Sequence, residues 1–405
     1  MGISIGLVGL GAFGSEFAEL FKAHPLVDRV ALCDREPDRV AAFAKRESWR
    51  DKLNPKDCYT SLDDICRSDV DALVIITQHW LHAPQCVQAM EAGKHVYSAV
   101  PIITIPDGDE TLEWCDKLVR TATRTGRFYM YGETTYYRPE AMFCRRKAAE
   151  GAFGDFVYAE GEYFHDVDDH GCCLRHVIAH RLASKAGAEW ASMKQRYMDR
   201  GVKEGPMHYP THSTSGPVCV MNAHAQKVTA YGFRNRNNDS YFDDAEFSNE
   251  TAFFKMSNGA SVRICEHREI AGSIDPEHET FRVMGTRGTF VNGTWKEKQP
   301  GVYFCPTPLI QTNLTPADMR DPLPPDVLKA FQAVRPNDFY GGHGGSHAYL
   351  VNEFADAIAR ERTPAINVWE AVRYMAMGVM AHKSAMRDGE TLDVPDWGDA
   401  PSDEC

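Results

Sequence analysis

The segment ISIGLVGLGAFG (residues 3–14) opens the chain and decides the expected fold. It begins with a short apolar run that is typical of a buried parallel strand. Gly9, Gly11 and Gly14 follow with the spacing G-x-G-x-x-G, and residues 15–21 have the pattern of a helix. A glycine-rich turn between a strand and a helix is typical of dinucleotide-binding domains.

The next expected strand, residues 30–33, ends at Asp34, twenty residues after Gly14. An acid at this position accepts hydrogen bonds from ribose hydroxyls and repels a 2′-phosphate, which favours NAD over NADP. Arg35 could soften that preference. The start of the helix adds free N–H groups and partial positive charge for the phosphates. We expect the turn and the strand end to hold NAD through Gly9, Gly11, Ala12, Phe13, Gly14, Asp34 and Arg35.

The first 131 residues continue to alternate expected strands with expected helices. Further strands are expected at residues 71–77, 95–100 and 128–131. This alternation predicts right-handed crossovers and a parallel, doubly wound sheet, so residues 1–131 are expected to form a Rossmann domain. Ligands of such sheets bind beyond the carboxyl ends of the strands. Further coenzyme contacts are therefore expected from Thr77, Gln78, Trp80, His82, Val100 and Pro101. Packing alone could equally explain Trp80 and His82.

After Gly132 the pattern changes, and a second, α+β domain is expected over residues 132–405. Residues 166–216 are expected to be mostly irregular, and eight prolines from Pro300 to Pro336 predict a long irregular arm. The two C-terminal helices are expected to pack back on the Rossmann domain. The expected strands indicate a largely antiparallel sheet, which could also pair subunits in a homo-oligomer. These strands are residues 156–165, 228–233, 249–256, 260–268, 281–284 and 289–291.

Length and composition exclude several classes of function. A chain of 405 residues can bury the cores of two domains, and its net charge of −13 disfavours nucleic acid and anionic membranes as partners. No apolar run reaches the roughly 20 residues that a membrane span needs. The first strand begins at residue 3, which leaves no room for a signal peptide, and the twelve cysteines follow no disulfide framework. We therefore expect a cytoplasmic protein with reduced thiols.

The order of these motifs resembles that of the Gfo/Idh/MocA oxidoreductase family over nearly the whole chain. Residues 93–97 (GKHVY) are similar to the family strand that leads to a Glu-Lys-Pro motif. The lysine of that motif assists proton movement at the reacting hydroxyl in the family's dehydrogenases. Here Ala99, Val100 and Pro101 occupy the three positions, and a valine cannot do this.

The NAD-dependent glycosidase branch, glycoside hydrolase family 109, is a closer resemblance because it has Glu-Val-Pro at this place. The strand YAEGEYFHD (residues 158–166) is similar to its HAEGAYIHD strand, and YPTH (209–212) and GGHGG (341–345) resemble two more of its motifs. Some residues depart from the branch. Ala99 replaces the acid, and the residues after His212 and Gly345 also differ.

The resemblance implies a sugar or glycoside as the small-molecule substrate and NAD as the cofactor. The implied reaction is a glycosidase reaction without net redox. It consists of transient oxidation at C3, removal of the proton at C2, loss of the aglycone, addition of water and return of the hydride. A net NAD-dependent sugar or polyol dehydrogenase is one alternative, and a non-catalytic NAD-binding sensor is another.

Two Tyr–His pairs are the candidate catalytic residues. Tyr163 and His165 are expected on one face of a strand, because side chains alternate. If Pro210 begins a helix, His212 lies one turn beyond Tyr209. Each pair could instead be a packed aromatic beside a satisfied histidine. The resemblance implies that Tyr163 is the base at C2, positioned by His165, and such a base needs a depressed pKa or a charged neighbour. It implies that His212 carries the proton of the C3 hydroxyl, while Tyr209 assists the leaving group or water.

The domain junction supplies candidate substrate-binding residues. Tyr136-Tyr137-Arg138 resembles the Tyr-x-Arg motif of the branch. We expect Glu133, Tyr137 and Arg138 to contact the sugar, although a structural ion pair would equally explain Arg138.

Residues 165–180 carry many His, Asp and Cys side chains. His176 and His180 have the i,i+4 spacing of helical metal ligands, but neither an H-E-x-x-H nor a C-x-x-C motif accompanies them. We therefore expect no metal.

Overall fold

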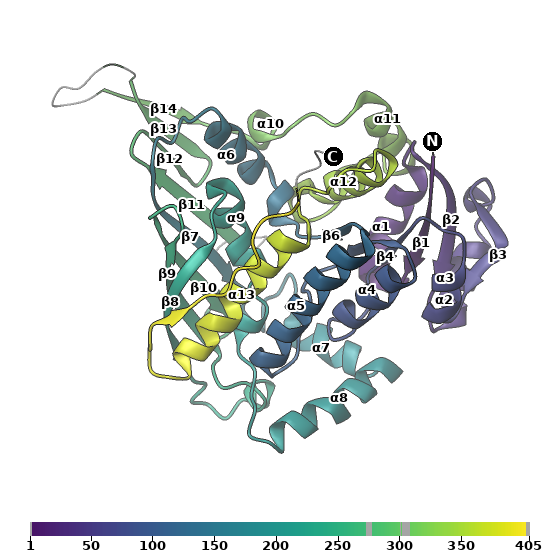
Figure 1. The fold of residues 1–405 in the computed structure, drawn as a ribbon, viewed down its shortest axis with the longest axis horizontal. Coiled ribbons are helices and arrows are strands. Elements are labelled where there is room, and N and C mark those ends of the chain that lie inside the picture. Colours follow the sequence, from purple (N-terminus) through teal and green to yellow (C-terminus); the bar gives the residue numbers. More distant parts are fainter. Residues whose placement is uncertain (1, 273–277, 300, 302–307, 402–405) are drawn as a thin grey trace.

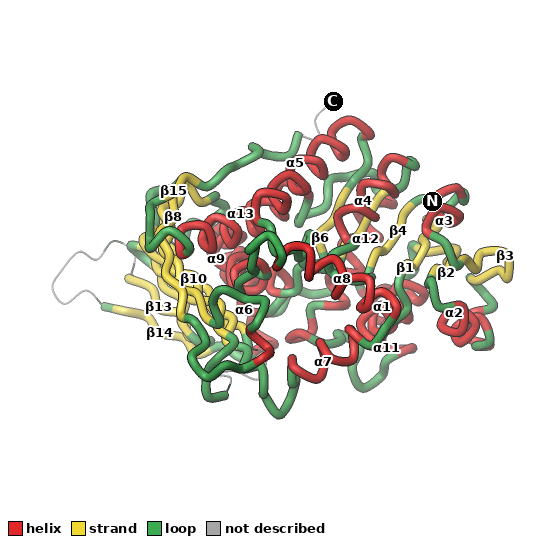
Figure 2. The backbone as a smooth tube through the Cα atoms, turned by 90° about the horizontal axis from the view of Figure 1, so that it is seen from below, coloured by secondary structure: helices red, strands yellow, loops and turns green. Residues whose placement is uncertain are grey.

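The computed structural model describes residues 2–272, 278–299, 301 and 308–401. It contains a six-stranded and a nine-stranded sheet, with helices between them (Figures 1 and 2). None of the helices in these ranges combines the length and the hydrophobicity that a membrane span requires.

The first sheet is parallel throughout and has the order β3-β2-β1-β4-β5-β6, which confirms the predicted Rossmann architecture. Its central strands are buried on both faces, as their apolar runs predict. The strands are β1 (Ile3–Val8), β2 (Val27–Cys33), β3 (Leu53–Tyr59), β4 (Ala72–Ile75), β5 (His95–Ser98) and β6 (Tyr129–Tyr131). The helices are α1 (Ala12–Ala23), α2 (Pro37–Ala44), α3 (Leu62–Arg67), α4 (His82–Glu91) and α5 (Gly108–Thr125).

The sequence pattern did not predict β3. This strand lies at the edge of the sheet and contains Pro55, which cannot donate a ladder hydrogen bond. Its side chains do not alternate cleanly between buried and exposed, so the periodicity of a strand is absent.

The second sheet has the order β14-β13-β12-β11-β7-β10-β9-β8-β15. Only β7 and β10 run parallel among its described neighbours, which confirms the prediction of a largely antiparallel sheet. The strands are β7 (Phe156–Phe164), β8 (Ala225–Phe233), β9 (Asn249–Met256), β10 (Ser261–His267), β11 (Glu279–Gly285), β12 (Gly288–Val291), β13 (Thr294–Lys298), β14 (Leu309–Asn313) and β15 (Leu392–Asp393).

The expectation that residues 166–216 are irregular is wrong, because three helices occupy much of this segment. They are α7 (Leu174–Leu182), α8 (Lys185–Met198) and α9 (Thr211–Met221). Helix α9 is buried all round between the sheet and other helices, so it lacks the amphipathic period that marks a surface helix. Helix α8 is fixed by the side chain of Ser184, which accepts a hydrogen bond from Gly187 N–H, and by Trp190, which stacks on Trp80.

The proline-rich arm also contains regular structure. Besides β14, it forms α10 (Pro316–Met319) and α11 (Pro325–Val334), each with a proline in its first turn, where the missing N–H costs nothing. Residues 300 and 302–307 of the expected arm lie outside the described residues.

The remaining helices connect the two sheets. Helix α6 (Pro139–Ala149) follows the junction, and α12 (His347–Ala359) packs beside α1, where the rings of Phe354 and Phe21 are 6.1 Å apart. Helix α13 (Val368–Ala385) begins at the capping residue Asn367 and lies between α5 and β8 (Figure 1). The two C-terminal helices thus link the first sheet to the second.

Candidate active site

The glycine turn after β1 has a conformation that suits a dinucleotide. Gly9 has φ +93°, and a Cβ there would lie 2.1 Å from the carbonyl oxygen of Ile76. A Cβ on Gly14 would lie 2.0 Å from the Gly9 carbonyl oxygen, so α1 can approach the turn only with glycine here. A Cβ on Gly11 would meet only Arg39, at 3.8 Å. The turn is therefore tight on the protein side and open at Gly11, where a pyrophosphate would lie. Ala12 and Phe13 are exposed at the start of α1.

Asp34 lies at the end of β2 beside this turn. Its carboxylate accepts hydrogen bonds from Leu10 N–H at 2.8 Å and Glu36 N–H at 2.9 Å. Arg39 Nη1 lies 3.4 Å from the same carboxylate. Arg35 instead forms two 3.0 Å contacts with Glu189 of α8. Arg39, in the first turn of α2, is therefore the arginine beside Asp34, and the sequence pattern did not indicate it.

The segments that follow β4 and β5 are tied to each other by His82. Its Nδ1 lies 2.8 Å from the carbonyl oxygen of Pro101, and its Nε2 lies 3.4 Å from that of Thr77. Burial lowers the pKa of His82 to about 4, so the ring is neutral. Trp80 is buried and stacks on Trp190, with centroids 4.7 Å apart and an interplanar angle of 7°. His82 and Trp80 are thus used in packing.

Other predicted coenzyme contacts lie at the carboxyl edge of the first sheet. Thr77 and Gln78 are half-buried just beyond β4, and Thr77 Oγ1 donates a hydrogen bond to Gln85 Oε1 at 2.5 Å. Val100 and Pro101 are buried beyond β5, so an aliphatic side chain occupies the position for which the family resemblance implies a lysine.

The four rings of the two Tyr–His pairs form one group. Tyr163 Oη lies 2.8 Å from His165 Nδ1, because both side chains are on the same face of β7 and its extension. Tyr209 precedes α9 and His212 lies in its first turn. Pro210 is the N-cap residue rather than the first helical residue, and this correction does not separate them. The His212 ring lies 5.1 Å from that of Tyr163 and 5.4 Å from that of Tyr209, centroid to centroid.

This group reaches the carboxyl edge of the first sheet. The ring of His79, which follows β4, lies 5.5 Å from that of Tyr209. His343 lies in the glycine-rich segment before α12. Its ring centroid is 6.5 Å from that of His212 and 5.9 Å from that of Phe13, which is at the start of α1 directly after the glycine turn. The Tyr–His group and the coenzyme turn therefore belong to one site.

The protons of the Tyr163–His165 pair can be assigned. Burial raises the pKa of Tyr163 well above its ordinary value and lowers that of His165 to about 4, so both groups are neutral. Tyr163 therefore donates to His165 Nδ1, and His165 Nε2–H donates to the carbonyl oxygen of Cys172 at 2.8 Å. The guanidinium carbon of Arg268 lies 4.5 Å from the centre of the Tyr163 ring. A charged neighbour that would stabilise a phenolate is thus present.

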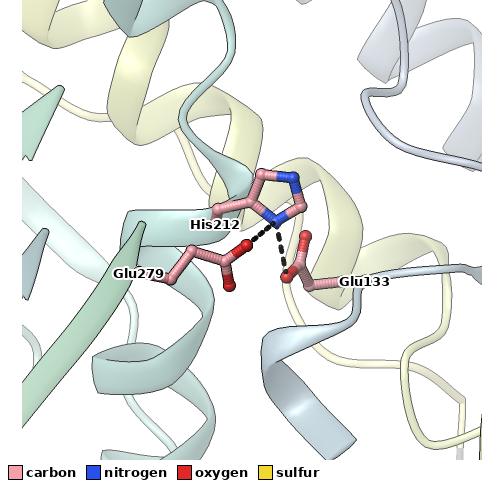
Figure 3. A group of neighbouring side chains, drawn as sticks. All are labelled: Glu133, His212 and Glu279. Atoms are coloured by element: carbon pink, nitrogen blue, oxygen red, sulfur yellow. Dashed lines mark hydrogen bonds and ion pairs between the residues drawn. The ribbon is translucent and has the colours of Figure 1, made fainter. Parts of the chain in front are cut away.

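His212 lies between two buried carboxylates (Figure 3). Its Nδ1 is 3.3 Å from Glu133 Oε1 and 3.4 Å from Glu279 Oε1. Burial alone would lower the pKa of His212, but the carboxylates of Glu279 and Glu133 raise it to about 9. Both carboxylates hold Nδ1, which leaves Nε2 as the nitrogen that can meet a substrate hydroxyl.

The predicted substrate-binding residues take different places. Glu133 contacts His212, while Arg138 Nη1 lies 3.1 Å from Glu279 Oε2 in an ion pair, which is the alternative that the sequence left open. Tyr137 stacks on Tyr349, with ring centroids 6.2 Å apart. Tyr137 is therefore part of the packing around the junction.

Glu279 was missed in the sequence, and no local pattern marks it. Its position follows from strand pairing, because β11 runs antiparallel to β7 and Glu279 is the register partner of Tyr163. Arg268 was missed for the same reason, since it follows β10, the other neighbour of β7.

The His, Asp and Cys side chains of residues 165–180 do not converge. Asp168 is paired with Arg175, 2.8 Å away, and His180 is exposed on α7. Among the described residues, the set of His, Cys, Asp and Glu that lies close enough to hold a metal ion is instead Glu133, His212 and Glu279.

The fold and this site define a class: a protein with an NAD-binding Rossmann domain and a second domain that supplies most of the candidate catalytic side chains. Residues 3–133 match the family model described as an oxidoreductase family with an NAD-binding Rossmann fold. Residues 137–401 match the C-terminal domain of glycosyl hydrolase 109. Because this second match spans more than half of the chain, the protein belongs to the glycosyl hydrolase 109 family.

Curated relatives agree with this assignment. A glycosyl hydrolase family 109 protein of Solibacter usitatus is 25% identical over 438 residues, covering 98% of this chain and 88% of the relative. A protein of the same name from Porphyromonas gingivalis is 24% identical over 430 residues, covering 98% and 84%.

Solved structures share the fold over the same length. A levoglucosan dehydrogenase in complex with NADH and levoglucosan has a TM-score of 0.70 at 17% identity, covering 98% of this chain and 100% of that one. The myo-inositol 2-dehydrogenase of Lactobacillus plantarum has a TM-score of 0.66 at 16% identity, with the same coverage. At these identities the likeness establishes the fold alone.

Proposed function

We propose that this protein is an NAD-dependent glycosidase that acts on a sugar or glycoside by transient oxidation at C3, elimination and hydration, without net redox. The observation that carries the proposal is the contiguous group of Tyr163, His165, Tyr209 and His212 beside the coenzyme turn. The names of the family 109 relatives support a glycosidase.

The residues present fit NAD. The open face of Gly11 and the exposed start of α1 suit the pyrophosphate, and Asp34 suits the ribose hydroxyls. Bound NAD supplies reversible hydride transfer at a sugar carbon. The proposed site residues on the coenzyme side are the glycine turn, Asp34 and the ends of β4 and β5 near Thr77 and Val100.

Tyr163 and His165 form the proton relay for C2. When Tyr163 passes its proton to His165 Nδ1, the phenolate can remove the C2 proton, which a neighbouring C3 ketone makes acidic. Arg268 stabilises that phenolate through its position over the ring. The Cys172 carbonyl fixes the tautomer of His165 by accepting its Nε2–H.

His212 and Tyr209 handle the remaining protons. Glu133 and Glu279 orient the imidazole through Nδ1 and raise its pKa to about 9, so Nε2 accepts the proton of the C3 hydroxyl in the neutral form of His212. Tyr209, whose ring lies 5.4 Å from that of His212, assists the leaving group or the incoming water.

The competing function is a net sugar dehydrogenase, which the names of the structural neighbours favour. Valine at position 100, where the dehydrogenases of the resembled family have lysine, argues against it. The test is to incubate the protein with a panel of aryl glycosides and free sugars, with and without added NAD⁺, while aglycone release and NADH absorbance are followed. Aglycone release without net NADH supports the glycosidase. Net NADH formation supports the dehydrogenase, and absence of both with NAD still bound supports a sensor.

We also propose that the protein forms a homo-oligomer through the outer face of the second sheet. This face carries exposed apolar side chains on β8 and β9, namely Tyr231 (62% exposed), Phe233 and Phe253. Light scattering of the wild type and of Phe253→Lys tests this, because a monomeric variant and an oligomeric wild type are expected. A monomeric wild type contradicts it. The cytoplasmic location stays a prediction.

A further inference from the structure

We infer that Glu133, His212 and Glu279 form a binding site for a divalent transition-metal cation such as Zn²⁺, Mn²⁺ or Co²⁺. One ligand atom from each residue lies within 4.8 Å of the other two, and all three side chains are buried. They come from three separate segments: Glu133 from the junction after β6, His212 from the start of α9 and Glu279 from the start of β11 (Figure 3).

A second observation points to a missing partner at the same place. Glu133 is completely buried, and its Oε2 has no hydrogen-bond partner among the described residues. Its other oxygen accepts a hydrogen bond from Thr135 N–H at 2.8 Å and faces His212 Nδ1. A buried carboxylate oxygen without a partner is costly, and a cation bound there removes the cost.

The charges around the site favour a cation. Glu133 and Glu279 bring two negative charges into the interior, and the ion pair with Arg138 compensates for one of them. The imidazole of His212, whose pKa these two carboxylates raise, supplies the second positive charge in the free protein. A bound divalent ion would take the place of the Nδ1 proton between the two carboxylates.

The ligand chemistry selects the class of ion. One imidazole nitrogen and two carboxylate oxygens suit Zn²⁺, Mn²⁺ and Co²⁺, whereas Mg²⁺ and Ca²⁺ prefer oxygen ligands alone. Three protein ligands leave a coordination position open, as in catalytic metal sites. The ion would bind Nδ1 on the carboxylate side of the ring, and Nε2 would still face the proposed sugar. A role of the ion in holding the His212 ring toward the sugar rests on the proposed function, whereas binding of the ion does not.

The test is direct metal binding by the full-length protein after treatment with a chelator. We expect calorimetry to show one tight site for Zn²⁺ per chain, Co²⁺ to give the visible absorption of a ligand field with nitrogen and oxygen donors, and Mg²⁺ to bind weakly. Glu279→Gln and Glu133→Gln should each weaken Zn²⁺ binding by roughly 100-fold or more.

Glu250→Gln is the matched control. Glu250 is also a buried glutamate in contact with a histidine, since its Oε1 lies 2.8 Å from His382 Nδ1, but it has no third ligand among the described residues. Zn²⁺ binding that is absent in the wild type, or equal in Glu279→Gln and the wild type, overturns the inference. Co²⁺ absorption that saturates at one ion per chain in the wild type supports the inference, even if a variant fails to fold. Metal binding without glycosidase activity would leave the site intact and reject only the proposed function.

Discussion

The phenolic oxygen of Tyr163 lies 2.8 Å from Nδ1 of His165, and both side chains are neutral in the free protein. The base proposed for C2 is therefore formed only when its proton moves to the imidazole. Burial opposes both charges that this transfer creates, and Arg268 over the phenol ring is the neighbour that favours the phenolate.

Tyr163→Phe removes the proton acceptor without changing the shape of the ring. We expect aglycone release to fall by about 10²- to 10⁴-fold, the usual contribution of general acid–base catalysis. NAD binding, followed by fluorescence, should be unchanged. Tyr158→Phe is a control on the opposite face of the same strand, and it should retain activity. Full activity of Tyr163→Phe would reject the assignment of the base.

Gly14→Ala and Gly11→Ala should separate folding of the turn from coenzyme binding. A Cβ at position 14 would lie 2.0 Å from the Gly9 carbonyl oxygen, so this variant should lose both thermal stability and NAD affinity. A Cβ at position 11 meets no atom closer than 3.8 Å, and φ there is −69°, so this variant should keep its melting temperature and bind NAD at least 10-fold more weakly. Differential scanning calorimetry and NAD titration are the measurements. Equal NAD affinity in Gly11→Ala and the wild type would place the pyrophosphate elsewhere.

Because His82 is buried in its neutral form, the free energy of unfolding should be lower in acid. The unfolded chain protonates this residue below its ordinary pKa of 6.5, whereas the folded protein does so only near its pKa of about 4. The unfolded state therefore binds more protons in this window, and the free energy of unfolding falls as the pH drops from 6.5 to 4. The shift corresponds to a loss of about 3 kcal/mol.

His82→Asn keeps a donor for the Pro101 carbonyl but cannot titrate, so the fall of its melting temperature between pH 6.5 and pH 4 should be smaller than in the wild type. His180→Asn, on the exposed face of α7, is the control. The same fall in His82→Asn and the wild type would show that His82 titrates normally in the folded protein.

Trp190→Ala should loosen α8 from the coenzyme edge. The ring stacks on Trp80 at 4.7 Å and is buried, so its removal should cost about 3 kcal/mol of stability and weaken NAD binding. Glu189→Gln removes the neighbouring ion pair with Arg35, which is exposed, and little change in stability is expected. Thermal denaturation with and without NAD compares the two variants. Equal effects of the two variants would mean that the ion pair holds α8 as much as the stack does.

The sequence predicted the parts of this molecule that depend on local pattern. The glycine turn, Asp34 and the alternation of strands and helices are local, and they define the Rossmann sheet. A helical turn at Pro210 was considered, but the length of helix α9 was not predicted, because burial on every side removes the period that marks a helix. Glu279 could not be placed, since its distance from His212 depends on the pairing of β11 with β7. The packing of Trp80 on Trp190 likewise depends on contact between distant segments.

The contacts of α8 and Tyr209 with the first sheet constrain how this protein can be recombined. Trp80 reaches Trp190 and His79 reaches Tyr209, so residues from both halves of the chain build the edge where the coenzyme is expected. A chimera that exchanges only the N-terminal half with a relative would carry a foreign surface against these two side chains. A transfer of the Rossmann domain into a relative should therefore require that α8 and residues 209–212 (YPTH) be transferred with it.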